Sequence, residues 1–320
     1  MGHDTAYRVL AGDADVDVVR DEPLARHTTY RIGGPARLMA TAHTVGGLRR
    51  TLEALDAACV DWVVLGGGSN VLVSDEGYDA CVIRLGRGFR DLRATGVTDA
   101  GDAAGAVVAD EDARATSLTA GAGASLSKLV MEACHRGLSG LEACVGVPGS
   151  VGGAIRMDAG SRTEWIGQHV ARVVVMRPGV GLVCLQGSDI SWGYRATSLE
   201  QGDIVLEVTL ELEPSSQEEI SADMERRIAR RRASQPLGLP SCGSVFRNPE
   251  GRSSAELVEG CGLKGYAVGG ARVSERHANF VVNEGGATAS DVVAVMGKMH
   301  GDVLGRYDID LTPEVRFLGF

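Results

Sequence analysis

Two glycine-rich stretches are the parts of this 320-residue sequence best suited to hold an anion. The first, GGGSN at 66–70, follows the apolar segment 62–65, and the second, PGSVGGA, covers residues 148–154. Consecutive backbone N–H groups without bulky side chains can form a concavity that holds a pyrophosphate without a lysine. Each stretch alone is better explained as an ordinary tight turn. Together they favour a dinucleotide-binding site.

Three further segments concentrate polar and charged side chains. Residues 241–248, SCGSVFRN, lie between two prolines, and the segments WGYR at 192–195 and LTPEVR at 311–316 place a cation or a carboxylate at strand edges. An arginine offers a permanently charged hydrogen-bond fork, and a serine hydroxyl is a small neutral proton donor. Taken singly, the first segment is equally consistent with a turn, and each of the other two is simply a polar edge.

Several familiar motifs are incomplete. The acidic run that begins at Asp13 lacks the glycine and the glutamate that a calcium loop needs at its sixth and twelfth positions. The GAGASL segment at Gly121 lacks the third glycine of the dinucleotide fingerprint, so a Rossmann site is not supported. Pro148 stands where a hydrolase elbow needs its first glycine, which leaves Ser150 a weak nucleophile candidate.

Composition excludes several classes of protein. The net charge is −10, which disfavours binding to nucleic acid or to an anionic membrane, and the mean hydropathy of +0.01 is that of a folded globular chain. The first residues lack a signal-peptide pattern, so we expect a cytoplasmic protein without a membrane anchor. Seven scattered cysteines without a CxxC pair indicate reduced thiols and no metal site. Glycine is unusually frequent, at 44 residues.

The first half of the chain mixes helices and short strands. We expect a helix capped by Thr44, strands at 62–65, 71–73 and 81–85, and a second helix that starts after Ser125 and stops at Gly137. Residues 94–115 are rich in Ala, Gly and Asp and are interpreted as an exposed hairpin tip or insertion.

The second half begins with strands and ends with mixed elements. Strands are expected at 170–176, 182–185 and 204–212, followed by a boundary at Pro214. Ser216 and Glu219 then form a capping-box pattern that opens an arginine-rich helix. A last helix is expected at 290–300 and a last strand at 315–318. The pattern is α+β, without a regular βαβ repeat.

Six segments make the sequence resemble the UDP-N-acetylenolpyruvoylglucosamine reductase family over about residues 24–319. Their occurrence in the family's order makes chance similarity improbable. The segments are TYRIGGPA at 29–36, LGGGSNVLVSD at 65–75, GVPGSVGGAIRMDAG at 146–160, YR at 194–195, PSCGSVFRNPEG at 240–251 and LTPEVRFLG at 311–319.

The resemblance implies a two-lobed FAD-binding domain of the PCMH type followed by a C-terminal α+β substrate-binding domain. We expect an N-terminal extension at 1–23, the FAD-binding domain at 24–213, with lobes of about 24–88 and 89–213, and the substrate-binding domain at 214–320. FAD is expected to be bound non-covalently. The residues expected to contact it are Tyr30, Gly66, Gly67, Gly68, Ser69, Asn70, Gly149, Ser150, Gly153 and Ala154.

The resemblance also implies a reaction in peptidoglycan precursor synthesis. NADPH would reduce UDP-N-acetylglucosamine enolpyruvate to UDP-N-acetylmuramate. The expected catalytic residues are Arg195, Ser244 and Glu314. Arg195 would stabilise the charge that develops on the enolpyruvyl carboxylate, a protonated Glu314 would add a hydrogen bond, and Ser244 would deliver a proton to carbon. The expected substrate-binding residues are Tyr194, Arg231, Asn248 and His277.

One loop departs from the family, and two other functions compete. Many relatives have NAGAYG where this chain has DAGSR at 158–162, which leaves the contacts of that loop open. A related flavin oxidoreductase that uses oxygen as acceptor would not need the Ser244 motif. A catalytically silent nucleotide-sugar-binding regulator would not need Arg195, Ser244 and Glu314 together. The presence of all three residues favours the reductase.

Overall fold

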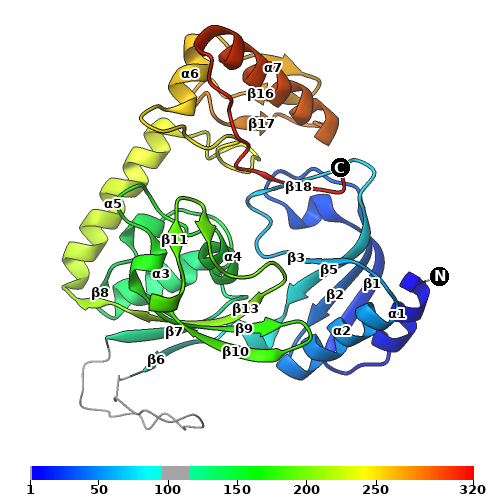
Figure 1. The fold of residues 1–320 in the computed structure, drawn as a ribbon. Coiled ribbons are helices and arrows are strands. Elements are labelled where there is room, and N and C mark those ends of the chain that lie inside the picture. Colours follow the sequence, from blue (N-terminus) through cyan, green and yellow to red (C-terminus); the bar gives the residue numbers. More distant parts are fainter. Residues whose placement is uncertain (1, 96–115) are drawn as a thin grey trace.

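The computed structural model describes residues 2–95 and 116–320, which form two lobes, each a sheet with helices, and a C-terminal α+β domain (Figure 1). The segment predicted as a hairpin tip falls mostly at 96–115, outside the described residues. Its flanks, β6 (Leu92–Thr95) and β7 (Ser117–Gly121), pair antiparallel. Within the described ranges, no helix is both long and apolar enough to cross a membrane.

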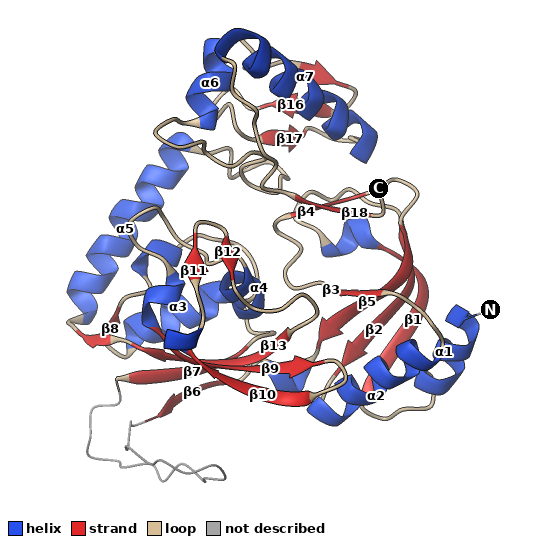
Figure 2. Cartoon of the chain, in the orientation of Figure 1, coloured by secondary structure: helices blue, strands red, loops and turns tan. Residues whose placement is uncertain are grey.

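The first lobe is a four-stranded sheet with two helices packed on one face (Figure 2). In spatial order its strands are β1 (Val16–Pro23), β2 (Pro35–Ala42), β5 (Tyr78–Leu85) and β3 (Trp62–Val64), and its helices are α1 (Gly2–Leu10) and α2 (Val45–Ala57). Strand β1 runs antiparallel to β2, whereas β2 and β3 are both parallel to β5. The segment before residue 24, expected to be an extension, therefore contributes α1 and β1 to this lobe.

Helix α2 begins where its sequence predicts. The Thr44 side chain accepts a hydrogen bond from the N–H of Gly47 at 2.9 Å, so it satisfies one of the free amides of the first turn. Leu48 and Leu55 are fully buried against the sheet. Their spacing puts both side chains on one helix face, which explains why this segment docks as a helix.

The second lobe is an antiparallel five-stranded sheet covered by helices. In spatial order its strands are β10 (Gly181–Gln186), β9 (Val170–Arg177), β13 (Ile204–Glu211), β7 and β6. The helices are α3 (Leu126–His135) and α4 (Val151–Arg156), with the short pairs β8 (Leu138–Ser139) and β14 (Glu213–Pro214), and β11 (Trp192–Gly193) and β12 (Ala196–Thr197). Ser125 stands at the N-cap of α3 as predicted, but its side chain makes no capping bond.

Short 3-10 turns complete the two lobes. They are η1 (Leu24–His27), η2 (Arg87–Phe89), η3 (Glu142–Cys144), η4 (Ile166–His169) and η5 (Gly187–Asp189). Gly137 has a φ of +68° just after α3, which agrees with its predicted role as a helix stop.

Helix α5 (Gln217–Ser234) leads from the second lobe to the C-terminal domain (Figure 1). Ser216 caps it by accepting a hydrogen bond from the N–H of Glu219 at 3.1 Å. The domain itself packs α6 (Ser254–Gly260) and α7 (Ala289–Tyr307) against the small sheet β15 (Ala267–Val268), β16 (Ala271–Val273) and β17 (Val281–Asn283). Helix α7 extends seven residues beyond the predicted end at His300, because Met299 and Val303 continue its buried face.

The last strand returns to the first lobe. Strand β18 (Arg316–Leu318) pairs parallel with β4 (Val71–Val73), which directly follows the first glycine-rich loop. The hydrophobic core of the C-terminal domain also takes in Tyr30, Ile32 and Leu72 of the first lobe. The two regions are therefore joined by a strand pair and by a shared core, so residues far apart in sequence meet at this junction.

Candidate active site

The two glycine-rich loops lie against each other. The Ser69 hydroxyl donates to the carbonyl of Pro148 at 3.0 Å. A Cβ added at Gly67 would lie 2.6 Å from the Cα of Gly149, closer than side chains approach backbone. Glycine at position 67 is therefore what allows the loops, one from each lobe, to meet.

Several backbone amides of these loops point to no acceptor. The N–H groups of residues 66–70, and those of Gly149 and Ser150, have no hydrogen-bond acceptor among the described residues. Unpaired amides in consecutive positions form a site for an anion. The geometry thus agrees with a cradle for a phosphorylated cofactor.

The far end of the second loop does not contribute amides to this cradle. The N–H of Gly153 donates to the Ser150 hydroxyl at 3.2 Å, and the N–H of Ala154 donates to the Ser150 carbonyl within α4. Gly153 and Ala154 were expected to contact the cofactor, but neither has a free amide. Because the Ser150 hydroxyl caps α4, the structure also gives no support to Ser150 as a nucleophile.

Asn70 ties the first glycine loop to the C-terminal segment. Its side-chain amide donates to the backbone carbonyl of Glu314 at 3.1 Å, and its own carbonyl accepts from the N–H of Arg316 at 3.0 Å. The loop expected to hold the cofactor and the segment that carries the expected catalytic glutamate are therefore neighbours.

Arg195 and Glu314 form an ion pair at this junction. Arg195 lies in the two-residue turn between β11 and β12, where its φ of +59° is in the left-handed region that side chains rarely adopt. Its Nε donates to Glu314 Oε1 at 2.7 Å, and its Nη1 donates to the carbonyl of Gly160 at 3.3 Å. The side chains are only 22% and 11% exposed, respectively. Glu314 was expected to donate a hydrogen bond in a protonated form. In this structure its Oε1 accepts one from Arg195.

Ser244 reaches the same junction from the C-terminal domain. The carbonyl of the next residue, Val245, accepts from the N–H of Glu314 at 2.8 Å, which fixes the serine segment beside the glutamate. Asn279 braces this segment, because its side chain accepts from the N–H of Phe246 and donates to the carbonyl of Phe246. In the described parts of the chain the Ser244 hydroxyl has no hydrogen-bond partner, so it is free to donate.

Arg231 is the member of the arginine-rich helix α5 that faces the junction. Its Nε is buried without a hydrogen-bond partner among the described residues and lies beside Gly146. Burial lowers the pKa of Arg231 below its usual value, and the positive charge of Arg195 acts in the same direction. A half-buried guanidinium next to another one, with no carboxylate of its own, is suited to an anionic ligand.

The other arginines of α5 have different roles. Arg226 and Arg227 pair with Asp223, and Arg227 also forms a bidentate pair with Glu164, whereas Arg230 and Arg232 are exposed. The arginines of this helix therefore differ in their surroundings. Arg231 faces the site, and the rest make surface pairs or face solvent.

The expected substrate-binding residues occupy separate positions around the junction. Tyr194 is 40% exposed, with the Arg195 guanidinium 5.2 Å from its ring centre. The side-chain oxygen Oδ1 of Asn248 accepts from the N–H of Ser254 at 2.9 Å, which leaves the side-chain nitrogen Nδ2 available. His277 stacks edge-on against Phe280, which bridges to Ser244. Burial lowers the pKa of His277, and nearby Lys264 acts in the same direction.

Tyr30 was expected to contact the cofactor, and the structure corrects this. The residue is fully buried, its hydroxyl donates to the carbonyl of Val281 at 2.9 Å, and its carbonyl accepts from the Asn283 amide at 3.0 Å. Its aromatic ring supplies apolar surface to the C-terminal core, so Tyr30 joins the first lobe to that domain and is not accessible to a ligand.

Comparison with known proteins decides the family. Residues 36–179 match the family described as "FAD binding domain", and residues 235–318 match "UDP-N-acetylenolpyruvoylglucosamine reductase, C-terminal domain". The chain is 41% identical over 303 residues to UDP-N-acetylenolpyruvoylglucosamine reductase of Heliobacterium modesticaldum, covering 94% of this chain and 90% of that protein. The protein of the same name from Bacillus subtilis is 35% identical, with 94% of both chains covered.

The chain belongs to the UDP-N-acetylenolpyruvoylglucosamine reductase family. A solved member, UDP-N-acetylenolpyruvylglucosamine reductase from Thermus caldophilus, superposes with a TM-score of 0.78 at 34% identity, covering 95% of this chain and 98% of that one. The predicted fold, a two-lobed FAD-binding domain of the PCMH type followed by a C-terminal α+β domain, is confirmed. As a reductase of this family, the protein is an FAD-dependent oxidoreductase of peptidoglycan precursor synthesis, and NADPH is the family's reductant.

The residues of this reductase fit FAD. Free amides at 66–70 and at Gly149 and Ser150 suit the cofactor's pyrophosphate. Arg156, at the end of α4, has a buried Nη1 without a partner among the described residues. Burial lowers its pKa, the charge of Asp203 opposes this effect, and the charge of Arg316 adds to it. A buried guanidinium nitrogen without a partner near the loops is consistent with a bound anion.

Sequence reasoning missed two residues at the junction. Asn279 braces the Ser244 segment but carries no motif of its own, so no sequence signal pointed to it. Arg247 has a buried Nε without a partner in the described ranges, and it lies inside the SCGSVFRN segment, which was a usable signal.

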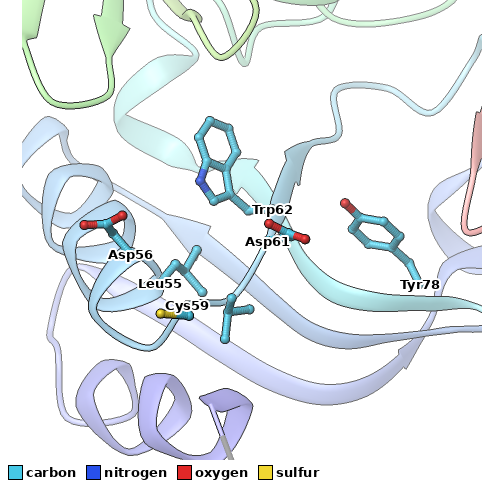
Figure 3. Close-up of a pocket in the computed structure, with 7 residues that line it drawn as sticks. Leu55, Asp56, Cys59, Asp61, Trp62 and Tyr78 are labelled. Carbon is cyan, nitrogen blue, oxygen red and sulfur yellow. The ribbon is translucent and has the colours of Figure 1, made fainter.

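A hollow of about 490 Å³ lies elsewhere on the reductase (Figure 3). It is in the first lobe, where the end of α2 meets the starts of β3 and β5. Its lining residues are Leu55, Asp56, Cys59, Val60, Asp61, Trp62 and Tyr78. None of the expected site residues lines this hollow, so it has no part in the site described above.

Proposed function

We propose that this chain reduces UDP-N-acetylglucosamine enolpyruvate to UDP-N-acetylmuramate with NADPH, and that Arg195, Glu314 and Ser244 are its catalytic residues. The observation that carries the proposal is that the three segments carrying these residues meet beside the first glycine loop. Arg195 pairs with Glu314, and Val245, the neighbour of Ser244, accepts from the N–H of Glu314. Bound FAD supplies the two-electron reduction of the substrate double bond. The protein must then hold the substrate carboxylate and provide a proton.

Arg195 is suited to hold the carboxylate. Reduction of the enolpyruvyl group moves negative charge onto that carboxylate, and a preorganised cation stabilises such charge strongly in a site with little water. Nε of Arg195 already donates a hydrogen bond to Glu314, and this bond orients the guanidinium. Glu314 thus acts with Arg195 by orienting it toward the substrate.

Ser244 is suited to donate the proton. Its hydroxyl has no acceptor among the described residues, and its backbone is held by Asn279 and by the Val245–Glu314 bond. A hydroxyl is a weak acid, yet a carbanion-like carbon is basic enough to take its proton. His277 is not proposed as the proton donor, because its ring packs against Phe280 and its Nδ1 accepts from the N–H of Asn279.

The remaining positions are assigned to the sugar nucleotide. Arg231, with its unpaired guanidinium, is proposed to meet the diphosphate, and Tyr194, Asn248 and His277 to contact the rest of the substrate. The amides of residues 66–70, Gly149 and Ser150 are proposed to hold FAD. We also propose a cytoplasmic location, because NADPH and nucleotide sugars are soluble metabolites of that compartment.

One assay tests the proposed function. Purified protein is mixed with NADPH and UDP-N-acetylglucosamine enolpyruvate, oxidation of NADPH is followed by absorbance, and the product is identified by mass. We expect oxidation that depends on the sugar nucleotide and yields UDP-N-acetylmuramate. Oxidation that depends on oxygen and produces hydrogen peroxide, or no oxidation at all, would reject the proposal.

A further inference from the structure

A carboxylate that the proposed mechanism does not use is buried two residues before Gly160, whose carbonyl accepts from the proposed catalytic arginine, Arg195. Asp158 is 4% exposed and follows α4 with a φ of +44°, in the left-handed region. Its Oδ1 accepts a hydrogen bond from the N–H of Gly167 at 3.1 Å. Buried carboxylates are costly unless other groups compensate them, so the position calls for an explanation.

Hydrogen bonds and packing contacts link the segments that carry Asp158 and Arg195. Gly167, which donates to Asp158, is covered by Trp192, since a Cβ at position 167 would lie 2.4 Å from the indole ring. Trp192 begins the short strand that leads into the Arg195 turn, and its indole N–H is fixed on the carbonyl of Gly187 at 3.0 Å. On the other side, Gly160, two residues after Asp158, accepts from Arg195 Nη1.

Few titratable groups face Asp158 in the described parts of the chain. Arg195 acts on it electrostatically, but the two make no direct ion pair, because Arg195 is paired with Glu314. The Cys144 thiol of η3 also faces Asp158, but burial raises the pKa of Cys144 to about 12, so the thiol stays neutral and lies 3.6 Å from the Ala159 carbonyl. Beyond Arg195 lie Glu314 and Arg231.

We propose that Asp158 is a positioning residue whose charge state sets how strongly Arg195 attracts the substrate carboxylate. The proposal rests on the function proposed above. When Asp158 is neutral, Glu314 is the carboxylate that pairs with Arg195 in the described structure, and the field at the substrate is more positive. When Asp158 is ionised, a second negative charge weakens that field, and the substrate carboxylate binds less tightly.

The switch falls near neutral pH. Burial raises the pKa of Asp158 to about 6, against the opposing effects of the Gly167 hydrogen bond and the Arg195 charge. Asp158 is therefore mostly neutral at about pH 5 and mostly ionised at about pH 8. Because the substrate carboxylate is ionised throughout this range, its affinity is expected to fall as the pH rises.

The test compares two ligands that differ in the carboxylate. UDP-N-acetylmuramate carries the lactyl carboxylate, and UDP-N-acetylglucosamine shares the nucleotide and sugar without it. Their affinities are measured by calorimetry at about pH 5 and about pH 8 for the wild type and Asp158→Asn, which keeps the acceptor for Gly167. Asp189→Asn, at an exposed carboxylate of the same lobe, is the control.

We expect the wild type and Asp189→Asn to lose about three- to tenfold in affinity for UDP-N-acetylmuramate between the two pH values, as expected for one partly screened charge. Asp158→Asn should lose little and bind this ligand more tightly than the wild type at about pH 8. The affinity for UDP-N-acetylglucosamine should respond to pH in the same way in all three proteins. An unchanged pH effect in Asp158→Asn would overturn the proposal.

A second measurement needs no substrate. Ionisation of Asp158 is costly only in the folded state. Its raised pKa therefore means that the free energy of unfolding falls as the pH rises from about 4 to about 6. The Tm advantage of Asp158→Asn over the wild type should therefore widen between about pH 5 and pH 7, and a constant difference would refute the assignment. If neither nucleotide sugar binds, the proposed function fails and this proposal with it, while the Tm series still reports the ionisation.

Discussion

Arg195 Nε lies 2.7 Å from Glu314 Oε1, and this ion pair joins two residues that are 119 positions apart in the chain. One partner comes from a turn of the second lobe, and the other comes from the segment that leads back to the first lobe. The pair leaves part of the Arg195 fork free for a ligand, because Nη1 is held by Gly160 and no contact of Nη2 is found in the described residues. The guanidinium is thus oriented before any substrate arrives.

Arg195→Lys should lower kcat by about 10²–10³-fold, the loss typical for removal of one preorganised charge-stabilising donor. Lysine keeps the charge but cannot contact Glu314, Gly160 and the substrate with one planar group. FAD content, measured from the ratio of flavin to protein absorbance, should stay normal. Arg136→Lys, at an exposed pair with Glu132 on α3, is the control and should turn over normally. Wild-type turnover by Arg195→Lys would make the residue structural.

Ser244→Ala should separate the two half-reactions. Bleaching of the flavin by NADPH needs no proton donor to the substrate and should proceed near its normal rate, whereas recolouring by the enolpyruvyl substrate should slow by at least about 10²–10⁴-fold. Stopped-flow absorbance measures both. The neighbouring Ser241→Ala is the control, because its hydroxyl makes no bond among the described residues and only its carbonyl is engaged, by Thr29. Equal slowing of both steps would show that Ser244 is not the donor.

Gly67→Val should lower FAD content before it harms folding. Its Cβ would meet the backbone of Gly149 at 2.6 Å, so the two loops would have to separate and their free amides would no longer face one ligand. The measurement is flavin absorbance and circular dichroism of the purified variant. Gly12→Val, at a glycine with no atom within 4 Å of its added Cβ, should bind FAD normally. Full flavin content in Gly67→Val would show that this loop is an ordinary turn.

Cys242→Ala should keep most of its activity. Complete burial raises the pKa of Cys242 to about 12, so the thiolate required of a nucleophile does not form at neutral pH. The thiol lies beside Tyr30 in the core shared by the first lobe and the C-terminal domain, so a modest decrease in Tm is expected from lost packing. Steady-state turnover with saturating FAD is the measurement. Loss of turnover with FAD still bound would restore Cys242 as a candidate catalytic residue.

Local patterns determined many elements of this protein. Thr44 and the spacing of Leu48 and Leu55 predicted α2, and Ser216 with Glu219 predicted the start of α5, because capping and one-sided burial act within a few residues. The glycine loops and the six ordered segments pointed to the FAD-binding fold and the family, which the comparisons confirm. The residue types of the site were also readable from those segments.

Tertiary structure decided which of these residues meet. Nothing local to Tyr30 shows that its ring is buried in the core of the C-terminal domain, and the return of β18 to β4 depends on pairing between segments more than 240 residues apart. The Arg195–Glu314 pair and the burial of Asp158 have the same origin. Long-range contacts and burial depend on how whole elements pack, so a window of sequence can indicate a chemical group but not its neighbours or its solvation.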